Sequence, residues 1–474
     1  MRYLGHLCAG FSYHGSMILR SLWPVFAFLY PFMVLPSAPH RPDVVLVKGG
    51  FVLLFVLLGA LLEMLAHPKA RLGHFLRLPR HLREQPALGL LLALALVMVL
   101  AALFSPEREV ALSGSTSDYA DSLYWGLLMV GVALLVYLRT REDPDTLRRV
   151  AVGLVLGGSL LALLALLEVL LGRGLFYRVD AGSLPMVTFP QKGHLSGYFV
   201  LTAGVALGLR NPWGLFLGAL GVGLAFNRAG LLALALLALL ALFRAPRYGL
   251  LTLFLLALGV GAGMGVVRLS AQGPLGGGGA VREVTDPQTL FARLFYWKAA
   301  LGGIADRPLL GFGGGVFEHR WPQYLSHADL ERFLRAEFGH PDIQLEGVAN
   351  APGGDPLFVF WGPDGHLKVR RLYGFRAHNG FLEVALKWGL LGLALYLSLL
   401  LLALRGLPDL NPGATGLLAL HAFFLFWFAI PEGEGAMWAL WGAALGAGSW
   451  AKFLPKPSEG RRPGEVAEPG FQGE

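Results

Sequence analysis

Residues 213–243 read WGLFLGALGVGLAFNRAGLLALALLALLALF, a nearly unbroken apolar run of 31 residues. The hydrocarbon core of a bilayer needs about 20 apolar residues for each spanning helix. The run is therefore too long for one upright helix and short for two. Its polar interruption is Asn227-Arg228, and we expect the chain to turn there, so that the run forms two spans.

Apolar runs of similar character recur along the chain. Of its 474 residues, 55% are hydrophobic and 15% are charged, whereas an average soluble domain carries about 25% charged residues. The composition predicts an all-α polytopic membrane protein with twelve spans. We place the spans at residues 18–36, 44–66, 87–104, 120–138, 149–171, 194–209, 213–227, 229–243, 248–267, 380–404, 413–431 and 433–453.

Lysine and arginine residues are distributed unequally between alternate loops. With the N-terminus in the cytoplasm, the inside segments hold nineteen of these residues and the short outside loops hold seven, in agreement with the positive-inside rule. If residues 213–243 were a single span, the four cations of residues 452–462 would move outside, against this rule. Both termini are therefore expected on the cytoplasmic side.

One long hydrophilic segment interrupts the series of spans. We expect nine spans within residues 1–267, one large extracytoplasmic loop domain at residues 268–379 and three further spans within residues 380–453. Residues 454–474 are rich in proline, glycine and charge and are expected to form a disordered cytoplasmic tail. Because loops of such length are usually functional, the loop domain is a candidate for part of the active site.

The loop domain carries signals for regular structure. Asp286-Pro287 is typical of an N-cap followed by proline at the first helical position. The helix that it opens should end before Arg307-Pro308. Residues 357–361 and 367–373 flank the turn residues Pro363-Asp364-Gly365, which predicts a small hairpin.

Ionisable residues gather at the predicted outer boundary of the membrane, where they are costly and therefore candidates for function. They are Lys192, His194, Arg228, Arg293 and His378. Fixed cations suit a diphosphate, because arginine offers a bidentate fork and lysine a point charge for phosphate oxygens. A neutral histidine beside them could take a proton from an attacking hydroxyl, since its ordinary pKa is about 6.5. Together these residues indicate glycosyl transfer from a lipid diphosphate.

Several stretches resemble motifs of the O-antigen ligase and polymerase superfamily. Residues 378–383 (HNGFLE), followed by residues 387–392 (KWGLLG), resemble its histidine motif. Residues 227–230 (NRAG) resemble its Ser-Arg-Gly pattern. Residues 293–297 (RLFYW), leading to residues 308–313 (PLLGFG), follow in the expected order.

The resemblance implies a twelve-helix fold of the lipid-dependent glycosyltransferase type called GT-C, an undecaprenyl-diphosphate-linked glycan donor and a metal-independent, inverting transfer. It also implies the bacterial inner membrane, with the active site on its outer face. Carried over by motif, His378 is the catalytic residue, and Arg228 and Arg293 hold the donor diphosphate. Lys192 and His194 take the matching donor-side position. We expect no cofactor.

The sequence departs from the family pattern in two places. Asn227 stands where serine is usual, and residues 325–375 form a long insertion. The resemblance covers roughly residues 190–405, and the first half of the chain matches in hydropathy only. The insertion leaves the acceptor open between a glycan, a lipid such as lipid A core, and a protein.

Five further side chains are candidates for substrate contacts. They are Tyr296, Trp297, Asn379, Glu432 and Glu434. The aromatic residues could stack on sugar rings, but aromatic residues are also enriched at membrane interfaces. Glu432 and Glu434 lie at the junction of the last two predicted spans, where they could aid acid–base chemistry or help to place an acceptor.

Two other functions compete with a ligase of lipopolysaccharide or other envelope polysaccharides. A polymerase would transfer the growing chain to a second lipid-linked repeat, and the sequence does not separate it from a ligase. A transporter is expected to show inverted repeats and charged residues near the bilayer midplane, and neither is evident in the sequence.

The sequence also argues against several other kinds of site. His319, His327 and His340 lack the spacing of metal ligands, so we expect no metal. Cys8 is the only cysteine, which excludes a disulfide framework. Membrane lipids are expected partners and nucleic acids are not.

Overall fold

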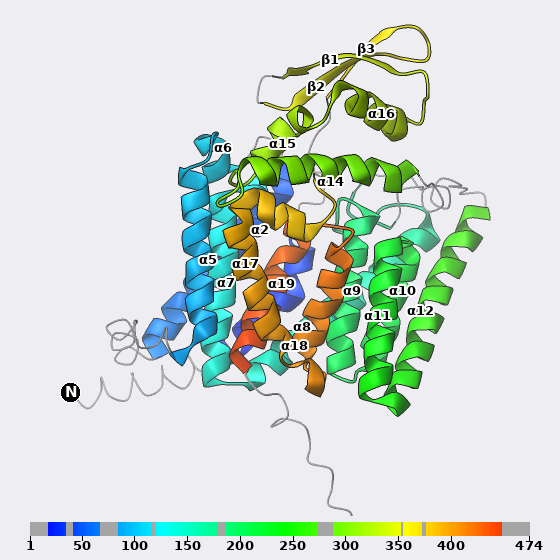
Figure 1. Ribbon diagram of the computed structural model, residues 1–474. Coiled ribbons are helices and arrows are strands. Elements are labelled where there is room, and N and C mark those ends of the chain that lie inside the picture. The colour runs from blue at the N-terminus through cyan, green and yellow to red at the C-terminus, as the bar shows by residue number, and fades with distance from the viewer. Residues whose placement is uncertain are drawn as a thin grey trace, which may run out of the picture.

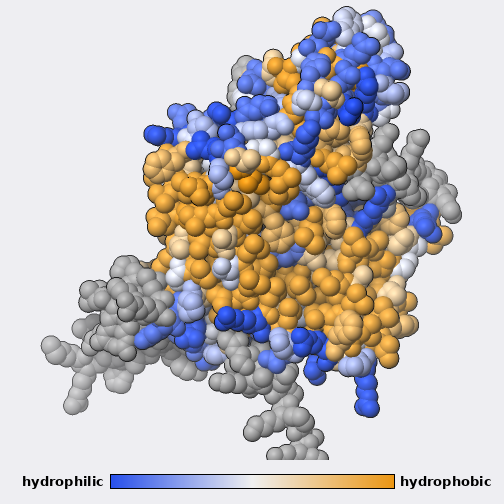
Figure 2. All heavy atoms as spheres, viewed as in Figure 1, coloured by the Kyte–Doolittle hydropathy of each residue, from blue (hydrophilic) through white to orange (hydrophobic). Residues whose placement is uncertain are grey.

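The computed structural model describes residues 18–34, 41–66, 84–114, 119–177, 185–272, 288–351, 354–371 and 376–447. These residues form a bundle of apolar helices with a smaller part at one end that contains a three-stranded sheet (Figure 1). On the face shown in Figure 2, a broad band of hydrophobic residues covers the bundle, and hydrophilic residues gather near its two ends and on the smaller part. The predicted tail at residues 454–474 and the predicted cap Asp286-Pro287 lie outside the described residues.

Among the described residues, six helices are long and apolar enough to cross a membrane. They are α2 (Arg41–Ala66), α5 (Pro86–Leu103), α7 (Leu123–Glu142), α8 (Asp145–Leu171), α12 (Pro246–Gln272) and α17 (Gly380–Leu404). Shorter helices pack among them, namely Ile18–Phe32, α9 (Lys192–Gly208), α10 (Pro212–Ala225), α11 (Arg228–Arg244), α18 (Pro412–Phe424) and α19 (Pro431–Ala447). The architecture is that of an α-helical membrane protein.

The apolar run at residues 213–243 is divided where the sequence predicts. α10 ends before Phe226, which takes the left-handed conformation with a φ of 49°. Asn227 then caps α11, because its side-chain oxygen accepts a hydrogen bond at 3.1 Å from the N–H three residues later. The break places Arg228 at the first position of α11.

α9 lies in the interior of the bundle. Every residue from Gly193 to Gly208 is buried, and α9 contacts α8, α10 and α18. Its glycines permit close approach, since a Cβ on Gly204 would lie 2.7 Å from the carbonyl oxygen of Thr415. The tight packing gives the residues at the N-terminus of α9 a rigid support.

The smaller part is built on a helix that lies across the end of the bundle (Figure 1). It consists of α14 (Gln288–Asp306), α15 (Phe317–Arg320), α16 (His327–Phe338), β1 (Gln344–Asn350), β2 (Pro356–Trp361) and β3 (Leu367–Arg371). Phe295, Trp321, Phe333 and Phe358 are buried together in its core. Side chains from α14, α16 and β2 therefore share one apolar interior.

Two local predictions for this part are confirmed. α14 ends at Asp306, before Arg307-Pro308, and β2 pairs with β3 as an antiparallel hairpin. The third strand, β1, pairs with β2 but was not predicted. Its sequence, QLEGVAN, contains a glycine and is largely exposed, so it lacks the alternation of apolar and polar residues that identifies a strand.

Two of the stretches that carry the family resemblance lie against each other. α17 is interrupted at Gly389, whose φ of 67° is in the left-handed region. The freed backbone groups pair with the segment at residues 308–313, because Leu390 N–H donates to Pro308 O at 2.7 Å and Phe312 N–H donates to Leu386 O at 2.8 Å. A side chain at Gly389 would collide with this segment, since a Cβ would lie 2.1 Å from Leu309 O.

Candidate active site

His378 lies at the junction between the smaller part and α17. Its φ of 49° is in the left-handed region, which non-glycine residues seldom occupy. Its Nδ1 is 2.9 Å from the carbonyl oxygen of Arg376, and its ring stacks on Tyr296 of α14 with centroids 5.1 Å apart. Burial and the charges of Arg293 and Arg376 lower the pKa of His378 to about 4. The imidazole is therefore neutral at neutral pH.

A pair of stacked aromatic rings, Trp427 and Phe428, joins two histidines that are far apart in the sequence. The pair lies between α18 and α19, with ring planes 1° from parallel. The His378 ring makes edge contacts with both at 5.5 and 5.2 Å between centroids. The His194 ring contacts the same two residues at 5.7 and 5.3 Å. We call Trp427 and Phe428 the aromatic pair.

One of the predicted cations, Arg293, lies over the aromatic pair, and a second, Arg228, is its charged neighbour. The Arg293 guanidinium is 5.5 Å from the ring centroid of Trp427, a distance at which a cation is attracted by the ring face. Burial and the charge of Arg228 lower the pKa of Arg293, so the two cations are close enough to repel each other. Among the described residues, neither arginine has a carboxylate within ion-pair distance. Their charges are thus available to an anion.

Lys192 is held near the aromatic pair by the two residues that follow it. It is the first residue of α9, and Gly193 follows it directly against Trp427, where a Cβ would lie 2.5 Å from Cζ2 of the indole. His194 comes next in the same turn and is buried. The N-terminus of α9 is therefore packed on the aromatic pair, with Lys192 partly exposed at its end.

Arg376 was overlooked in the sequence, although it lies two residues before His378. It is buried, and its guanidinium forms ion pairs with Asp121, with Glu318 at 3.3 Å and with Glu383 at 3.9 Å. The guanidinium also lies over the Phe428 ring at 5.7 Å. Its carbonyl is the hydrogen-bond partner of the His378 ring. The sequence gives no signal for this role, because its partners Asp121 and Glu318 lie in distant segments.

A small cavity lies beside this ion-pair cluster. It has a volume of about 50 Å³, and its lining includes Asp121, Arg376, Glu383, Lys387 and Glu434. Lys387 Nζ donates a hydrogen bond to Asp121 at 2.6 Å. The cavity is the size of one or two water molecules. It is therefore too small to hold a sugar ring, and its charges serve to hold α17 and the segment before it in place.

The remaining candidates for substrate contacts take structural positions. Asn379 caps α17 by accepting hydrogen bonds from two N–H groups, and its side-chain amide donates to Leu425 O at 3.0 Å. Glu434 accepts a hydrogen bond from the Trp125 indole. Glu432 is buried and lies close enough to Lys48 for their charges to interact. These contacts explain the residues without a substrate.

Tyr296 and Trp297 differ in their relation to His378. Tyr296 stacks on the His378 ring and contacts Phe333 in the core of the smaller part. Trp297 is partly buried, with its indole nitrogen out of solvent. Of the two, only Tyr296 has a ring contact with the histidine among the described residues.

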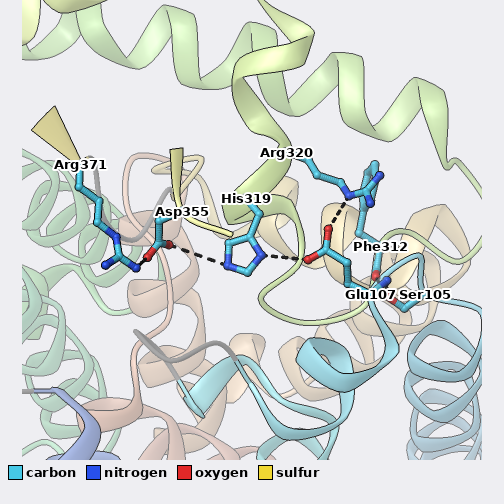
Figure 3. A network of polar contacts seen from close by, with 7 residues as sticks. All are labelled: Ser105, Glu107, Phe312, His319, Arg320, Asp355 and Arg371. Carbon is cyan, nitrogen blue, oxygen red and sulfur yellow. Dashed lines mark hydrogen bonds and ion pairs between the residues drawn. The ribbon is translucent and has the colours of Figure 1, made fainter. Parts of the chain in front are cut away.

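His319 has partners that account for it without a metal. Its Nδ1 lies 2.9 Å from Glu107 and its Nε2 lies 3.8 Å from Asp355 (Figure 3). Asp355 is also paired with Arg371 on β3. The hydrogen bonds from His319 and from Arg320 lower the pKa of Glu107. This network ties the sheet to the end of the bundle.

Metal-binding arrangements can be assessed in the part of the chain that the structure describes. No group of three or more histidine, cysteine, aspartate or glutamate side chains there is arranged to hold a metal ion. The site offers instead a neutral histidine, the aromatic pair and two arginines that have no carboxylate partner among the described residues. Such a set can bind an anion and accept a proton from a hydroxyl group.

Comparison with other proteins adds no assignment. No protein-family model matches the chain and no curated protein matches it, so what it does is inferred from its residues and their geometry.

Proposed function

We propose that the protein is a membrane glycosyltransferase of the O-antigen ligase type. It moves a glycan from an undecaprenyl-diphosphate donor to an acceptor hydroxyl, at the outer face of the bacterial inner membrane. In this proposal the chain crosses the membrane twelve times with both termini in the cytoplasm, and has the GT-C type of fold. The observation that carries the proposal is the neutral His378 beside Arg293, with Arg228 near by and no carboxylate paired to either arginine among the described residues.

In the proposed reaction the histidine accepts a proton and the arginines stabilise the leaving group. The acceptor oxygen forms a bond to the anomeric carbon while the bond from that carbon to the diphosphate oxygen breaks, which inverts the configuration. The electron pair leaves with the lipid diphosphate, whose added charge Arg293 and Arg228 stabilise. The acceptor proton passes to His378 as the new bond forms.

The hydrogen bond to the Arg376 carbonyl determines which ring nitrogen of His378 can accept a proton in the proposed reaction. If Nδ1 donates its hydrogen to the Arg376 carbonyl, Nε2 carries the lone pair. Nε2 is then the atom that accepts the proton from the acceptor. Its low pKa makes it a weak base, so it orients the hydroxyl first and takes the proton only as the hydroxyl oxygen bonds to carbon.

The test is glycan transfer by the purified protein from a synthetic undecaprenyl-diphosphate donor, with candidate acceptors supplied in turn. We expect His378→Ala to lower the rate by about 10²–10⁴-fold, the usual contribution of a positioned base. His340→Ala, which removes an exposed histidine of the smaller part, is the matched control and should keep the wild-type rate. A folded His378→Ala that matches wild type would refute the assignment, and transfer onto a second lipid-linked repeat would identify a polymerase.

A further inference from the structure

A groove on the bundle, separate from the candidate active site, has the character of a lipid site. It has a volume of about 640 Å³ and lies between the helix Ile18–Phe32 and the start of α8. This volume is within the usual range of ligand pockets. α7 begins just after Asp121, which pairs with Arg376, and ends just before Asp143, which pairs with Arg20 of this groove. The groove is therefore at the opposite end of the bundle from His378.

The two helices that form the groove are held close together on one side. A Cβ on Gly153 would lie 2.4 Å from Pro24 O, and a Cβ on Gly157 would lie 3.0 Å from Phe28 O. Small residues four apart permit such close packing of membrane helices. The two helices are therefore closely packed along one side of the groove.

One end of the groove is basic. Arg20, Arg148 and Arg149 line it together with Asp145. Asp143 pairs with Arg20 at 3.6 Å and with Arg149 at 2.9 Å, and Asp145 pairs with Arg149 at 3.6 Å. Arg148 is exposed and has no carboxylate within ion-pair distance among the described residues. Three arginines therefore meet two carboxylates, Asp143 and Asp145, and the excess positive charge at this end attracts an anion.

The rest of the groove is apolar. Val25, Phe28, Val152 and Leu156 line it, and Val25, Val152 and Leu156 have 44%, 40% and 57% of their surface exposed. Because a helix rises 1.5 Å per residue, Leu156 lies about 10 Å along α8 from Arg149. A ligand that fills the groove must therefore be anionic at one end and apolar over the following 10 Å or so.

We propose that this groove binds an anionic phospholipid of the membrane. The headgroup phosphate lies against Arg20 and Arg148, and the upper part of the acyl chains lies along Val25, Val152 and Leu156. A soluble anion would use only the basic end, and an uncharged lipid would use only the apolar wall. An anionic lipid uses both, and the bilayer supplies it at high local concentration.

The test uses the full-length protein in detergent, with its thermal stability measured as lipid is added. The probes are dioctanoyl phosphatidylglycerol, dioctanoyl phosphatidylcholine and inorganic phosphate. We expect phosphatidylglycerol to stabilise the wild type at about tenfold lower concentration than phosphatidylcholine, and inorganic phosphate to have no effect at matched ionic strength. This test does not depend on the proposed enzymatic function.

Two double variants of equal charge decide whether the groove is the site. Arg20→Gln with Arg148→Gln should weaken the response to phosphatidylglycerol about thirtyfold. Arg141→Gln with Arg244→Gln removes two exposed arginines from the same end of the bundle but outside the groove, and should leave the response unchanged. In a separate arm, Leu156→Trp should obstruct the apolar wall and weaken binding while both arginines remain.

Three results would overturn the proposal. Equal weakening in the two double variants would show general attraction of lipid to a basic surface. Stabilisation by inorganic phosphate as strong as that by phosphatidylglycerol would show a simple anion site. No response of the wild type to either lipid would mean that lipid does not occupy the groove.

Discussion

Arg293 and Arg376 lie over the two members of the aromatic pair, yet their surroundings are opposite. Arg293 is 5.5 Å from the Trp427 ring and has Arg228 as its charged neighbour. Arg376 is 5.7 Å from the Phe428 ring and is paired with three carboxylates. A buried cation that is already neutralised holds the protein together, whereas one that is left unneutralised is ready for an anionic ligand. Arg376 therefore has a structural role, and Arg293 is the cation available for the proposed donor.

The largest expected difference between the two arginines is in their contribution to protein stability. Arg376→Met removes the cation that pairs with Glu318 and Glu383 and leaves Asp121 with Lys387 alone. We expect a loss of about 3–5 kcal/mol in the free energy of unfolding. Arg293→Met removes a cation that has no carboxylate partner in the described part of the chain, and it should cost under about 1 kcal/mol. Thermal and denaturant unfolding of the two variants, prepared side by side, measure the difference. Equal losses would erase the distinction between the two arginines.

The second prediction concerns activity. In the proposed reaction Arg293 stabilises the charge that develops on the diphosphate, so Arg293→Gln should lower kcat/KM by about 10²–10³-fold with little loss of stability. Arg293→Lys should recover part of the rate, since lysine keeps the charge but loses the bidentate fork. Inhibition by inorganic pyrophosphate should weaken in parallel. Unchanged inhibition in Arg293→Gln would show that the diphosphate binds elsewhere.

The smallest expected effect is on pH dependence. The charge of Arg293 helps to hold the pKa of His378 at about 4, so Arg293→Gln should raise that pKa. Protonated His378 cannot accept the acceptor proton, and the activity that remains in the variant should therefore be lost at a higher pH than in the wild type as the pH falls. A pH–rate profile of kcat measures the shift. A shift in the opposite direction would show that Arg293 does not act on His378.

How much the sequence could predict depended on the distance over which the residues act. The break at Asn227-Arg228 was predictable because a cap acts within three residues, and the hairpin of β2 and β3 was predictable because its turn chemistry is local. The six long apolar helices follow from composition. The roles of His378, Arg228 and Arg293 remain predictions, drawn from residue type and resemblance.

The aromatic pair and Arg376 could not be found in this way. From the sequence, Trp427 and Phe428 resemble ordinary interfacial aromatic residues. Their contacts with both histidines form only when α9, α14 and α17 pack around them. From the sequence alone, Arg376 resembles an ordinary solvated charge. Its ion pairs with Asp121 and Glu318 form only in the folded protein, because these residues are distant in the sequence.

The sequence by itself determined that this chain is a helical membrane protein and which ionisable residues are candidates for chemistry, because apolar run length and capping are local properties. Only the tertiary structure decided which candidates meet and which cations are neutralised. The reason is physical, since the availability of a charge depends on every group within several ångströms of it, and long-range packing supplies most of those groups.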